Sequence, residues 1–433
     1  MAVTRRTLVN GSLGAGVAAV AAATAAHGSA RTAAAPAALA AANAAADVVV
    51  IGGGMGGVSA AKFLRLYGGT GLSVTLVEPS AAYTSNIMSN LVLTGQRTIS
   101  SLRYSYARLV STYGVGVVQA RALGLDPANK AVTLSTGARL TYKRLVVAPG
   151  LQFDPLPGLV ATDYDTTFPH AWQGGPQTTL LRQQIVAMKP GGTFVMTIPL
   201  APYRCPPGPY ERACVVADWL KVNRPGSKVI VLDANAKIIA EPVAFTTAFT
   251  SIHAGTISYR PGVVIDHVDK AARRVYLSTG EAIAFDVFNP IPPSRAGAFA
   301  VDAGLCNVGG RWAGVNVLSY ESTAVPGVHV LGDTIGTTMP KSGHMANAQG
   351  KVVADAIVRA LAGQAPDPAP VTSSGCYSPI TMSTASWLTG VFQYDAASST
   401  MKAVSVVEAP SISSQNYNQM SKWFSGLMAD TFA

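Results

Sequence analysis

Residues 47–57, DVVVIGGGMGG, join a run of β-branched residues to a glycine-rich turn. Such a run is typical of a buried parallel strand. The G-x-G-x-x-G spacing permits a tight turn and leaves backbone N–H groups at the start of a helix, where they can bind a pyrophosphate. We therefore predict a dinucleotide-binding unit in which the cofactor is contacted by Gly52, Gly54, Met55 and Gly57.

An acidic residue follows at the position that such a unit requires. A second strand over residues 73–77 ends at Glu78. This acid lies about 20 residues beyond the last glycine, where it can accept hydrogen bonds from ribose hydroxyls. A lone glycine motif is weak evidence, because it also occurs in turns without a ligand. The ordered series of strand, glycines, helix, strand and acid predicts bound FAD.

Two later strands extend the predicted cofactor site. One covers 145–150, LVVAPG, and the other covers 328–333, VHVLGD. In flavoproteins with two dinucleotide-binding domains, a Gly-Asp pair of this kind places its carboxylate near the flavin ribityl chain. The predicted contacts from these strands are Ala148, Pro149, Gly150, Gly332 and Asp333.

Lys341 and Ser342 precede a helix that we predict from about residue 346 to residue 361. The N-terminus of that helix can stabilise negative charge on a reduced flavin. We expect both residues to contact the cofactor, with a solvated loop position as the alternative for Lys341.

A segment in the middle of the chain lacks a second phosphate-binding loop. Strands are predicted over 192–198 and 228–233, and APYRCPPGPYE occupies residues 201–211 between them. Its prolines remove N–H donors and stiffen the backbone. A pyrophosphate is not expected there, which argues against a nicotinamide substrate.

The predicted fold is α/β, with two Rossmann-like domains arranged as in glutathione reductase-like flavoproteins and a smaller C-terminal α+β domain. The boundaries are an export leader over 1–46, an FAD-binding domain over 47–167 and 291–365, a second Rossmann-like domain over 168–290, and a flavin-shielding or partner-binding domain over 366–433.

The first 46 residues have the layout of an export signal. A charged start with Arg5-Arg6 precedes an apolar, alanine-rich run and small residues, which resembles a twin-arginine signal. An alanine-rich leader with two chance arginines is the alternative. The run is too short and weakly apolar for a stable membrane span. We expect export to the periplasm or an equivalent compartment, with no membrane span in the mature protein.

Composition excludes several classes. The chain of 433 residues is 49% hydrophobic and 12% charged, which is too apolar for disorder. Its formal net charge of +10 comes without a run of Lys and Arg, so nucleic acid is not an expected partner. The histidines show no metal-ligand spacing and we predict no metal site. Four cysteines do not make a disulfide scaffold.

Several stretches together resemble the flavoprotein subunit of flavocytochrome c sulfide dehydrogenase. They are PYRCPPGPYERAC from Pro202, IPPSRAG from Ile291, GDTIGTTMPKSGHMANAQGK from Gly332, GCYSP around Cys376, and the final WFSGLMADTFA. The likeness runs from about residue 47 to residue 433, and the proline-rich stretch is its most distinctive part.

The resemblance implies an enzyme that oxidises sulfide to sulfur or polysulfide and passes electrons to a c-type cytochrome subunit. Cys205 and Cys376 would form a redox-active disulfide beside the flavin, with Glu211 close to them. A purely structural disulfide is the alternative for the cysteines, and an ion pair with Arg204 or Arg212 is the alternative for Glu211. The chain has no C-x-x-C-H motif, so the haem would belong to a separate protein.

One position departs from the family pattern. The family often attaches FAD through a cysteine in a Tyr-Thr-Cys stretch, and this chain has Tyr83-Thr84-Ser85. We therefore predict non-covalent FAD, with Ser85 and Asn90 among the contacts. Two other functions stay open: a sulfide:quinone oxidoreductase, and a non-catalytic electron-transfer or sulfur-binding flavoprotein. We interpret Cys214 and Cys306 as structural, and His344 as the histidine that could line the site.

Overall fold

The computed structural model describes residues 44–433. The predicted export signal lies outside the described residues. Residues 44–433 belong to one compact unit, so the domain boundaries proposed within them stay predictions. Within the described part, no helix has the length and apolar character needed to cross a bilayer.

The larger sheet has the strand order β18-β19-β20-β8-β1-β2-β5, and β6 and β7 extend it beside β8. Its centre is parallel: β1 (Ala44–Ile51) lies between β8 (Arg139–Val147) and β2 (Val74–Val77), and β20 (Val328–Val330) pairs with β8. Val48, Val49 and Val50 are fully buried, as expected for a parallel strand covered on both faces.

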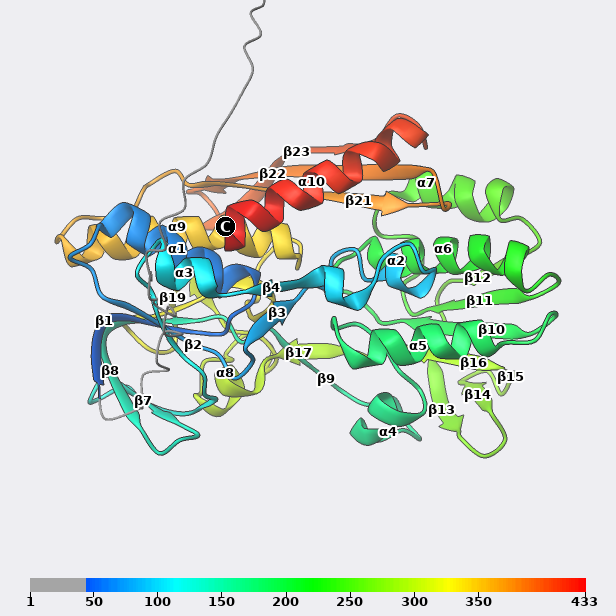
Figure 1. Cartoon of the computed structure of the whole chain (residues 1–433), viewed down its shortest axis with the longest axis horizontal. Coiled ribbons are helices and arrows are strands. Elements are labelled where there is room, and N and C mark those ends of the chain that lie inside the picture. The colour runs from blue at the N-terminus through cyan, green and yellow to red at the C-terminus, as the bar shows by residue number, and fades with distance from the viewer. Residues whose placement is uncertain (1–43) are drawn as a thin grey trace, which may run out of the picture. The chain divides into compact units, whose positions relative to one another are not determined.

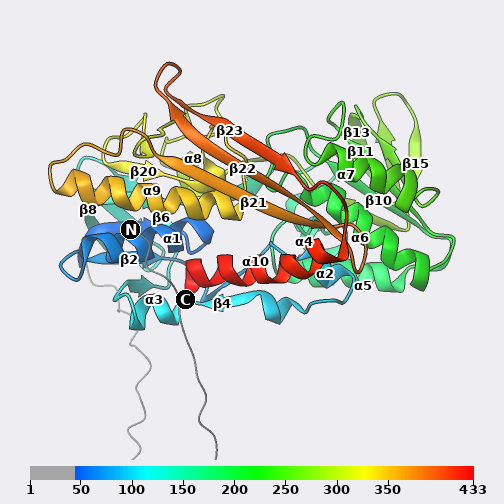
Figure 2. The ribbon, with the colours of Figure 1, turned by 90° about the horizontal axis from the view of Figure 1, so that it is seen from above.

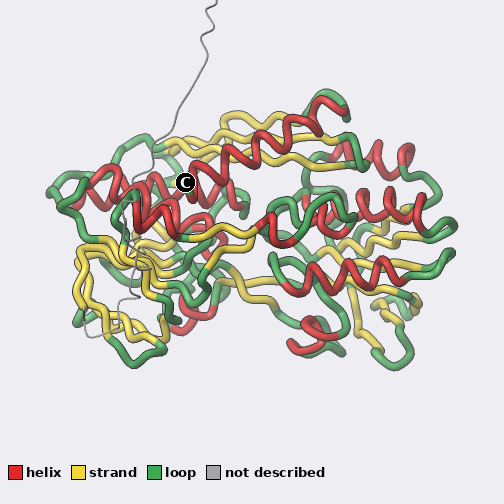
Figure 3. Tube along the Cα trace, in the orientation of Figure 1, coloured by secondary structure: helices red, strands yellow, loops and turns green. Residues whose placement is uncertain are grey.

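The second sheet is also parallel, with the order β12-β11-β10-β16. Its strands are β10 (Thr193–Ile198), β11 (Lys228–Asp233), β12 (Ile257–Arg260) and β16 (Val287–Pro290). Helices α5 (Pro176–Ala187) and α6 (Gly208–Asn223) pack against it. In Figure 3 the strands of the two sheets form two separate groups. The prediction of two Rossmann-like units is confirmed.

The C-terminal part combines an antiparallel sheet with a long helix. Strands β21 (Val371–Pro379), β22 (Ala385–Asp395) and β23 (Thr400–Glu408) pair in order, and α10 (Ser414–Phe432) lies along the sheet (Figures 1 and 2). Because β21 also contacts α6 and α9 (Gly343–Leu361), this part joins the two parallel sheets.

Serine caps set where the two long C-terminal helices begin. Helix α9 starts at Gly343 rather than near residue 346, because Ser342 Oγ accepts a hydrogen bond from Met345 N–H and caps it. Helix α10 covers 19 residues. Ser413 caps α10, and apolar residues such as Phe424 bury one side of it.

The remaining elements are short. They are β3 (Ala82–Thr84), α2 (Asn90–Leu93), η1 (Ile99–Leu102), β4 (Arg103–Ser105), α3 (Ala107–Ser111), β5 (Gly116–Val118), β6 (Ala122–Asp126), β7 (Ala131–Leu134), β9 (Leu151–Phe153), α4 (Ala161–Thr166), α7 (Pro242–Thr247), η2 (Ala248–Ile252), β13 (Ile265–Asp269), β14 (Arg274–Leu277), β15 (Ala282–Ala284), β17 (Ser294–Ala296), α8 (Ala298–Asp302), β18 (Val315–Asn316), β19 (Glu321–Ser322) and η3 (Gly332–Thr334).

Helix α1 (Met55–Gly68) and helix α9 cross in close backbone contact. A Cβ atom added at Gly350 of α9 would lie 2.8 Å from Gly56 O and from Ala60 N of α1. Contacts this short cannot be relieved by turning a side chain, since the atoms belong to the backbone. The glycine therefore fixes the spacing between the two helices.

We expect Gly350→Ala to lower the free energy of unfolding by about 1–3 kcal/mol, because α1 and α9 must separate to accept the methyl group. Urea denaturation measures the change. The matched control is Gly426→Ala in α10, where an added Cβ meets no atom within 4 Å. That variant should gain about 0.5–1 kcal/mol, since alanine restricts the unfolded chain more than glycine. Equal stability of the two variants would contradict the argument.

Candidate functional site

A cavity of about 430 Å³ lies where the carboxyl ends of β1, β8 and β20 meet the start of α6 and strand β21. Such crevices at the carboxyl ends of parallel strands are the usual ligand sites of this architecture. Most predicted site residues line it: Gly54, Met55, Glu78, Asn90, Ala148, Pro149, Gly150, Cys205, Glu211, Gly332, Asp333, Ser342 and Cys376.

The glycine turn opens onto this cavity at the start of α1. Gly54 is the N-cap of α1, and this end of the described helix has neither a side-chain cap nor an acid in its first turn. Its first N–H groups and the positive end of its dipole therefore face the cavity unpaired, which suits a pyrophosphate. Glu78 Oε2 accepts a hydrogen bond from Gly53 N–H at 2.8 Å, which fixes the acid at the strand end.

Gly52 and Gly57 serve the turn and do not line the cavity. A Cβ atom at Gly57 would lie 1.9 Å from Gly52 O, and one at Gly52 would lie 2.2 Å from Ala148 O. Gly52 also has a φ of +101°, a conformation that disfavours other residues. Both glycines therefore have a structural role in the turn, and their contact with a cofactor stays a prediction.

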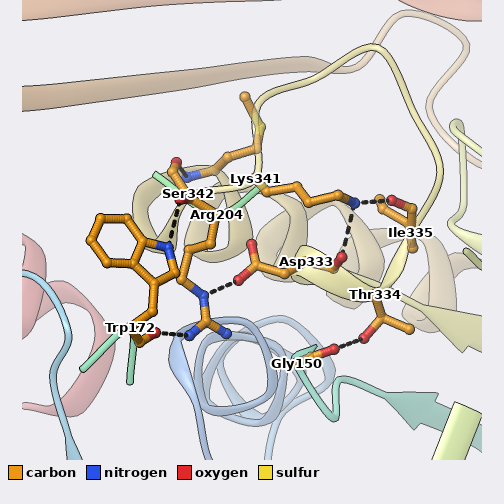
Figure 4. Close-up of polar contacts among 9 residues, drawn as sticks. Gly150, Trp172, Arg204, Asp333, Thr334, Ile335, Lys341 and Ser342 are labelled. Carbon is orange, nitrogen blue, oxygen red and sulfur yellow. Dashed lines mark hydrogen bonds and ion pairs between the residues drawn. The ribbon is translucent and has the colours of Figure 1, made fainter. Parts of the chain in front are cut away.

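Asp333 is held by an arginine that the sequence did not assign to it. Arg204 Nε donates to Asp333 Oδ2 at 2.6 Å, and Arg204 Nη1 donates to the carbonyl of Trp172 at 3.2 Å (Figure 4). The second carboxylate oxygen, Asp333 Oδ1, is buried without a hydrogen-bond partner among the described residues. Asp333, which lines the cavity, therefore has one oxygen fixed by Arg204 and one without a hydrogen-bond partner in residues 44–433.

Lys341 does not line the cavity. Its ammonium group donates to the carbonyls of Asp333 at 2.9 Å and of Ile335 at 2.6 Å, and lies 3.7 Å from the centre of the Trp312 ring (Figure 4). Burial lowers the pKa of Lys341 to about 8. The solvated alternative is wrong, because the side chain is buried and the loop's own carbonyls bind its charge, whereas the contact with the cofactor stays a prediction. Its backbone oxygen accepts the N–H of Cys205 at 2.7 Å, which connects this loop to the cysteine.

Ser85 is also absent from the cavity lining, although its neighbours Thr84 and Asn86 belong to it. The side chain is fully buried and its hydroxyl donates to Ile87 O at 3.2 Å. The local turn, rather than a cofactor, uses this hydroxyl.

Cys205 and Cys376 line the same cavity. Cys205 lies in the loop that precedes α6, and Cys376 lies in β21. Among the described residues both are free thiols. Cys205 has a φ of +55°, fixed by its bond to Lys341 O and by Gly208 N–H donating to its carbonyl. Burial raises the pKa of the Cys205 thiol to about 12, and the Glu211 carboxylate adds to the effect. Burial likewise raises the pKa of Cys376, as does proximity to Cys205.

Glu211 is buried and hydrogen-bonded by an amide rather than by a cation. Asn90 Nδ2 donates to Glu211 Oε1 at 2.9 Å, and Asn90 Oδ1 accepts a bond from Arg212 Nε. Arg212, fully buried, gives its other groups to the Asn289 side chain and to the carbonyls of His170 and Ala171. The proposed ion pair between Glu211 and Arg204 or Arg212 is therefore not formed in the described chain.

The protonated form of Glu211 is favoured by this environment. Burial raises the pKa of Glu211 to about 8, although the Asn90 hydrogen bond opposes the shift. The site thus holds a carboxylic acid next to a thiol pair. A carboxyl whose pKa lies near 8 can give up and take back a proton near neutral pH.

Three residues near the cavity carried weak or no signals in the sequence. His344 and Trp423 both line it, and Trp423 Nε1 is a buried donor with no partner in residues 44–433. His344 was a candidate from the sequence. Arg204 adjoins Cys205 in sequence, but its contact with Asp333 is 129 residues away and no local pattern predicts it. Cys214 is fully buried, as predicted for a structural thiol.

Three family models match successive parts of this chain. Residues 46–186 match pyridine nucleotide-disulphide oxidoreductase, residues 178–292 match the central part of the sulfide dehydrogenase [flavocytochrome c] flavoprotein chain, and residues 368–432 match the flavin-binding part of flavocytochrome c sulphide dehydrogenase.

Relatives agree with these matches. The chain is 53% identical over 45 residues to the sulfide dehydrogenase [flavocytochrome c] flavoprotein chain of Chlorobaculum thiosulfatiphilum, covering 10% of this chain and 92% of that sequence. It is 31% identical over 109 residues to the mitochondrial sulfide:quinone oxidoreductase of Mus musculus, a match of 25% of this chain and only 24% of that relative.

Solved structures share the fold. The sulfide:quinone oxidoreductase of Aquifex aeolicus has a TM-score of 0.71 at 17% identity, with 90% of this chain and 93% of that one covered. The putidaredoxin reductase–putidaredoxin complex has a TM-score of 0.63 at 18% identity, with 90% and 94% covered. Fold and site together define a flavoprotein of the pyridine nucleotide-disulphide oxidoreductase class.

Within that class, the chain belongs to the family of flavoprotein chains of flavocytochrome c sulfide dehydrogenase. The family resemblance drawn from the sequence is confirmed.

The residues of the cavity fit FAD. The start of α1 offers unpaired N–H groups to a pyrophosphate, and Glu78 stands at the end of β2 for ribose. Asp333 Oδ1 and Trp423 Nε1 are buried polar atoms left unpaired by residues 44–433 beside the cavity. A cofactor hydroxyl could donate to Asp333 Oδ1, and an acceptor group of the cofactor could accept from Trp423 Nε1. Bound FAD would then remove the free-energy cost of burying these two polar atoms without partners.

The raised pKa of Glu211 predicts how its removal changes stability with pH. The folded chain binds a proton more tightly than the unfolded chain, since the pKa rises from 4.5 to about 8. Stability is therefore full below pH 4.5 and falls as the pH rises through the folded value. We expect the wild type to lose roughly 2–4 kcal/mol more than Glu211→Gln across that range, measured by urea denaturation. Glu281→Gln, which removes an exposed carboxyl, should follow the wild type; parallel curves for all three proteins would refute the assignment.

Proposed function

We propose that this protein oxidises sulfide with FAD through a redox-active Cys205–Cys376 disulfide and passes the electrons to a c-type cytochrome. The observation that carries the proposal is the convergence of two cysteines from distant segments in one cavity with Glu211. Family membership supports it, and the matched family names contain both sulfide dehydrogenase and flavocytochrome c.

In the proposed reaction, HS⁻ attacks one sulfur of the disulfide. The S–S bond breaks, one cysteine becomes a persulfide and the other leaves as a thiolate. Glu211, protonated at neutral pH because burial raises its pKa to about 8, can give a proton to a leaving thiolate and recover it later. Asn90 holds the carboxyl in place through its bond to Oε1. FAD, when bound, supplies a two-electron acceptor that can release electrons singly.

A sulfide:quinone oxidoreductase is the second candidate. It is favoured by the likeness to the mouse and Aquifex aeolicus proteins that carry this name. Comparing cytochrome c and a soluble quinone as acceptors for the sulfide-reduced protein separates the two.

Export through the twin-arginine route, which would bring a folded flavoprotein to an exported cytochrome, completes the proposal.

Anaerobic sulfide should bleach the flavin absorbance of the wild type, and Cys205→Ser should abolish that bleaching while FAD stays bound. The serine cannot form the disulfide that sulfide attacks, whereas the cofactor contacts of α1 and Asp333 remain. Stopped-flow absorbance measures the rate, and Cys214→Ser is the matched control because Cys214 is packed in the core. Wild-type rates in Cys205→Ser would show that the disulfide is not the electron entry; an unbleached wild type would favour a non-catalytic flavoprotein.

Acid precipitation should release the flavin into the supernatant. Ser85 stands where the family often has a cysteine, and its hydroxyl is committed to Ile87 O. Absorbance of the washed pellet and of the supernatant measures the partition. Flavin that stays with the pellet would show a covalent bond and overturn the prediction.

A further inference from the structure

His344 contacts the backbone of the strand that carries Cys376, and no step of the proposed reaction uses it. It lies in the first turn of α9 and lines the cavity. Gly375 N–H donates to His344 Nδ1 at 2.9 Å, and the carbonyl oxygen of Gly375 lies 3.3 Å from the same nitrogen. Gly375 directly precedes Cys376 in β21. The imidazole therefore holds the backbone next to one of the two cysteines.

The place of β21 in its sheet explains why a side chain is needed there. β21 is an edge strand of the sheet β21-β22-β23. Along an edge, alternate residues direct both their N–H and their C=O away from the neighbouring strand. Gly375 is such a residue, because both of its backbone groups lie against His344. Gly375 is buried, so without the imidazole its N–H would lose its partner away from water.

The shorter of the two contacts requires a neutral imidazole. A backbone N–H can only donate, so the 2.9 Å bond needs a lone pair on His344 Nδ1. Burial lowers the pKa of His344, which favours the neutral form. The acceptor that holds Gly375 is therefore present at neutral pH.

A second side-chain bond joins the same two segments. Ser342 Oγ lies 2.9 Å from Ser374 Oγ, and both serines are buried. Ser342 is also the N-cap of α9, which fixes its own position. The start of α9 is thus bonded to two successive residues of β21, and the strand packs against this helix (Figure 2).

The same stretch of chain also holds the other cysteine. Lys341 directly precedes Ser342 (Figure 4), and its carbonyl oxygen accepts the N–H of Cys205 at 2.7 Å. Residues 341–344 therefore bond to the backbone of Cys205 and to that of Gly375. A disulfide forms only when the two Cα atoms lie about 4.4–6.8 Å apart. A segment that holds both backbones can set this separation.

We propose that His344 is a positioning residue for the cysteine pair, because it fixes β21 where Cys376 lies within reach of Cys205. The proposal rests on the proposed function, since it concerns the disulfide that sulfide would attack. His344 acts through the backbone of Gly375 and takes no part in making or breaking bonds to sulfur. Loss of its acceptor nitrogen therefore disfavours the disulfide relative to the two thiols.

The equilibrium between thiols and disulfide measures this role. FAD-loaded protein is equilibrated anaerobically with mixtures of oxidised and reduced dithiothreitol. The oxidised form takes two electrons and two protons from the thiols when the protein disulfide forms. Acid quenching, alkylation and mass spectrometry of the Cys205 and Cys376 peptides give the disulfide fraction. We expect His344→Leu to lower the equilibrium constant for disulfide formation about tenfold, which is about 30 mV for two electrons.

Two further variants separate positioning from general stability. In His344→Asn an amide oxygen can take the place of Nδ1, so this variant should recover most of the loss. His329→Leu removes another buried histidine, whose Nδ1 lies 2.9 Å from Ser319 O and outside both cysteine segments. Its equilibrium constant should equal that of the wild type. A wild-type constant in His344→Leu overturns the proposal, as does an equal shift in His329→Leu.

Ser374→Ala provides the same test if His344→Leu does not fold. It removes the bond to Ser342 and should lower the constant in the same direction. Ser373→Ala is the matched control, because Ser373 is the exposed neighbour of Ser374 in β21. Equal constants for the two serine variants would contradict the role given to the start of α9.

Hydrogen exchange tests the contact without the disulfide. The Gly375 N–H should exchange roughly tenfold faster in His344→Leu than in the wild type or in His329→Leu, because it loses its acceptor. Mass spectrometry of peptides that contain Gly375 measures the rate. If the wild type forms no disulfide in any mixture, the proposed function fails, and this rate alone decides whether His344 holds β21. Equal rates in all three proteins overturn the positioning role.

Discussion

Close backbone contact at the glycine turn determines where the rest of the site can lie. The turn after β1 touches both the start of α1 and the end of β8, at positions where a single methyl group would overlap a carbonyl oxygen. Gly350 imposes the same condition between α1 and α9. Because the spacing of these helices is fixed, three segments meet at one cavity. They are the start of α1, the Gly-Asp pair after β20 and the capped start of α9. A cofactor can then be held by backbone groups that have little freedom to move.

The sequence predicted the parts of this arrangement that depend on local chemistry. Glycine spacing, β-branched runs and the acid at Glu78 each impose a conformation or a contact within a few dozen residues, and all of them lie where expected. The burial of Lys341 was not predicted, because it depends on loop carbonyls that only the folded loop brings around the ammonium group. The contact of Arg204 was missed for a related reason. Its partner, Asp333, lies more than a hundred residues away along the chain, and pairing at that range leaves no pattern in the sequence.

The cysteine cavity is unusual in having buried acids without matching cations. Arg212, which is fully buried and adjoins Glu211 in α6, is hydrogen-bonded by two asparagines and by backbone carbonyls instead of by Glu211. Arg204 is used by Asp333. Desolvation therefore dominates the acids around the cysteines and keeps them protonated, whereas an ion pair would have kept them charged. The acid beside the loop of Cys205 can therefore take up and release a proton, because no ion pair fixes its charge.

The Arg204–Asp333 pair ties cofactor binding to the placement of the neighbouring cysteine. Arg204 immediately precedes Cys205, and the backbone carbonyl of Arg204 also accepts the indole N–H of Trp172. A ligand that engages the second oxygen of Asp333 therefore acts on the same short loop that fixes the left-handed backbone of Cys205. Binding linkage is reciprocal. With the proposed disulfide chemistry, the oxidation state of the cysteines and the affinity for the flavin become coupled quantities, so that a dissociation constant should be measured together with the redox state of the thiols.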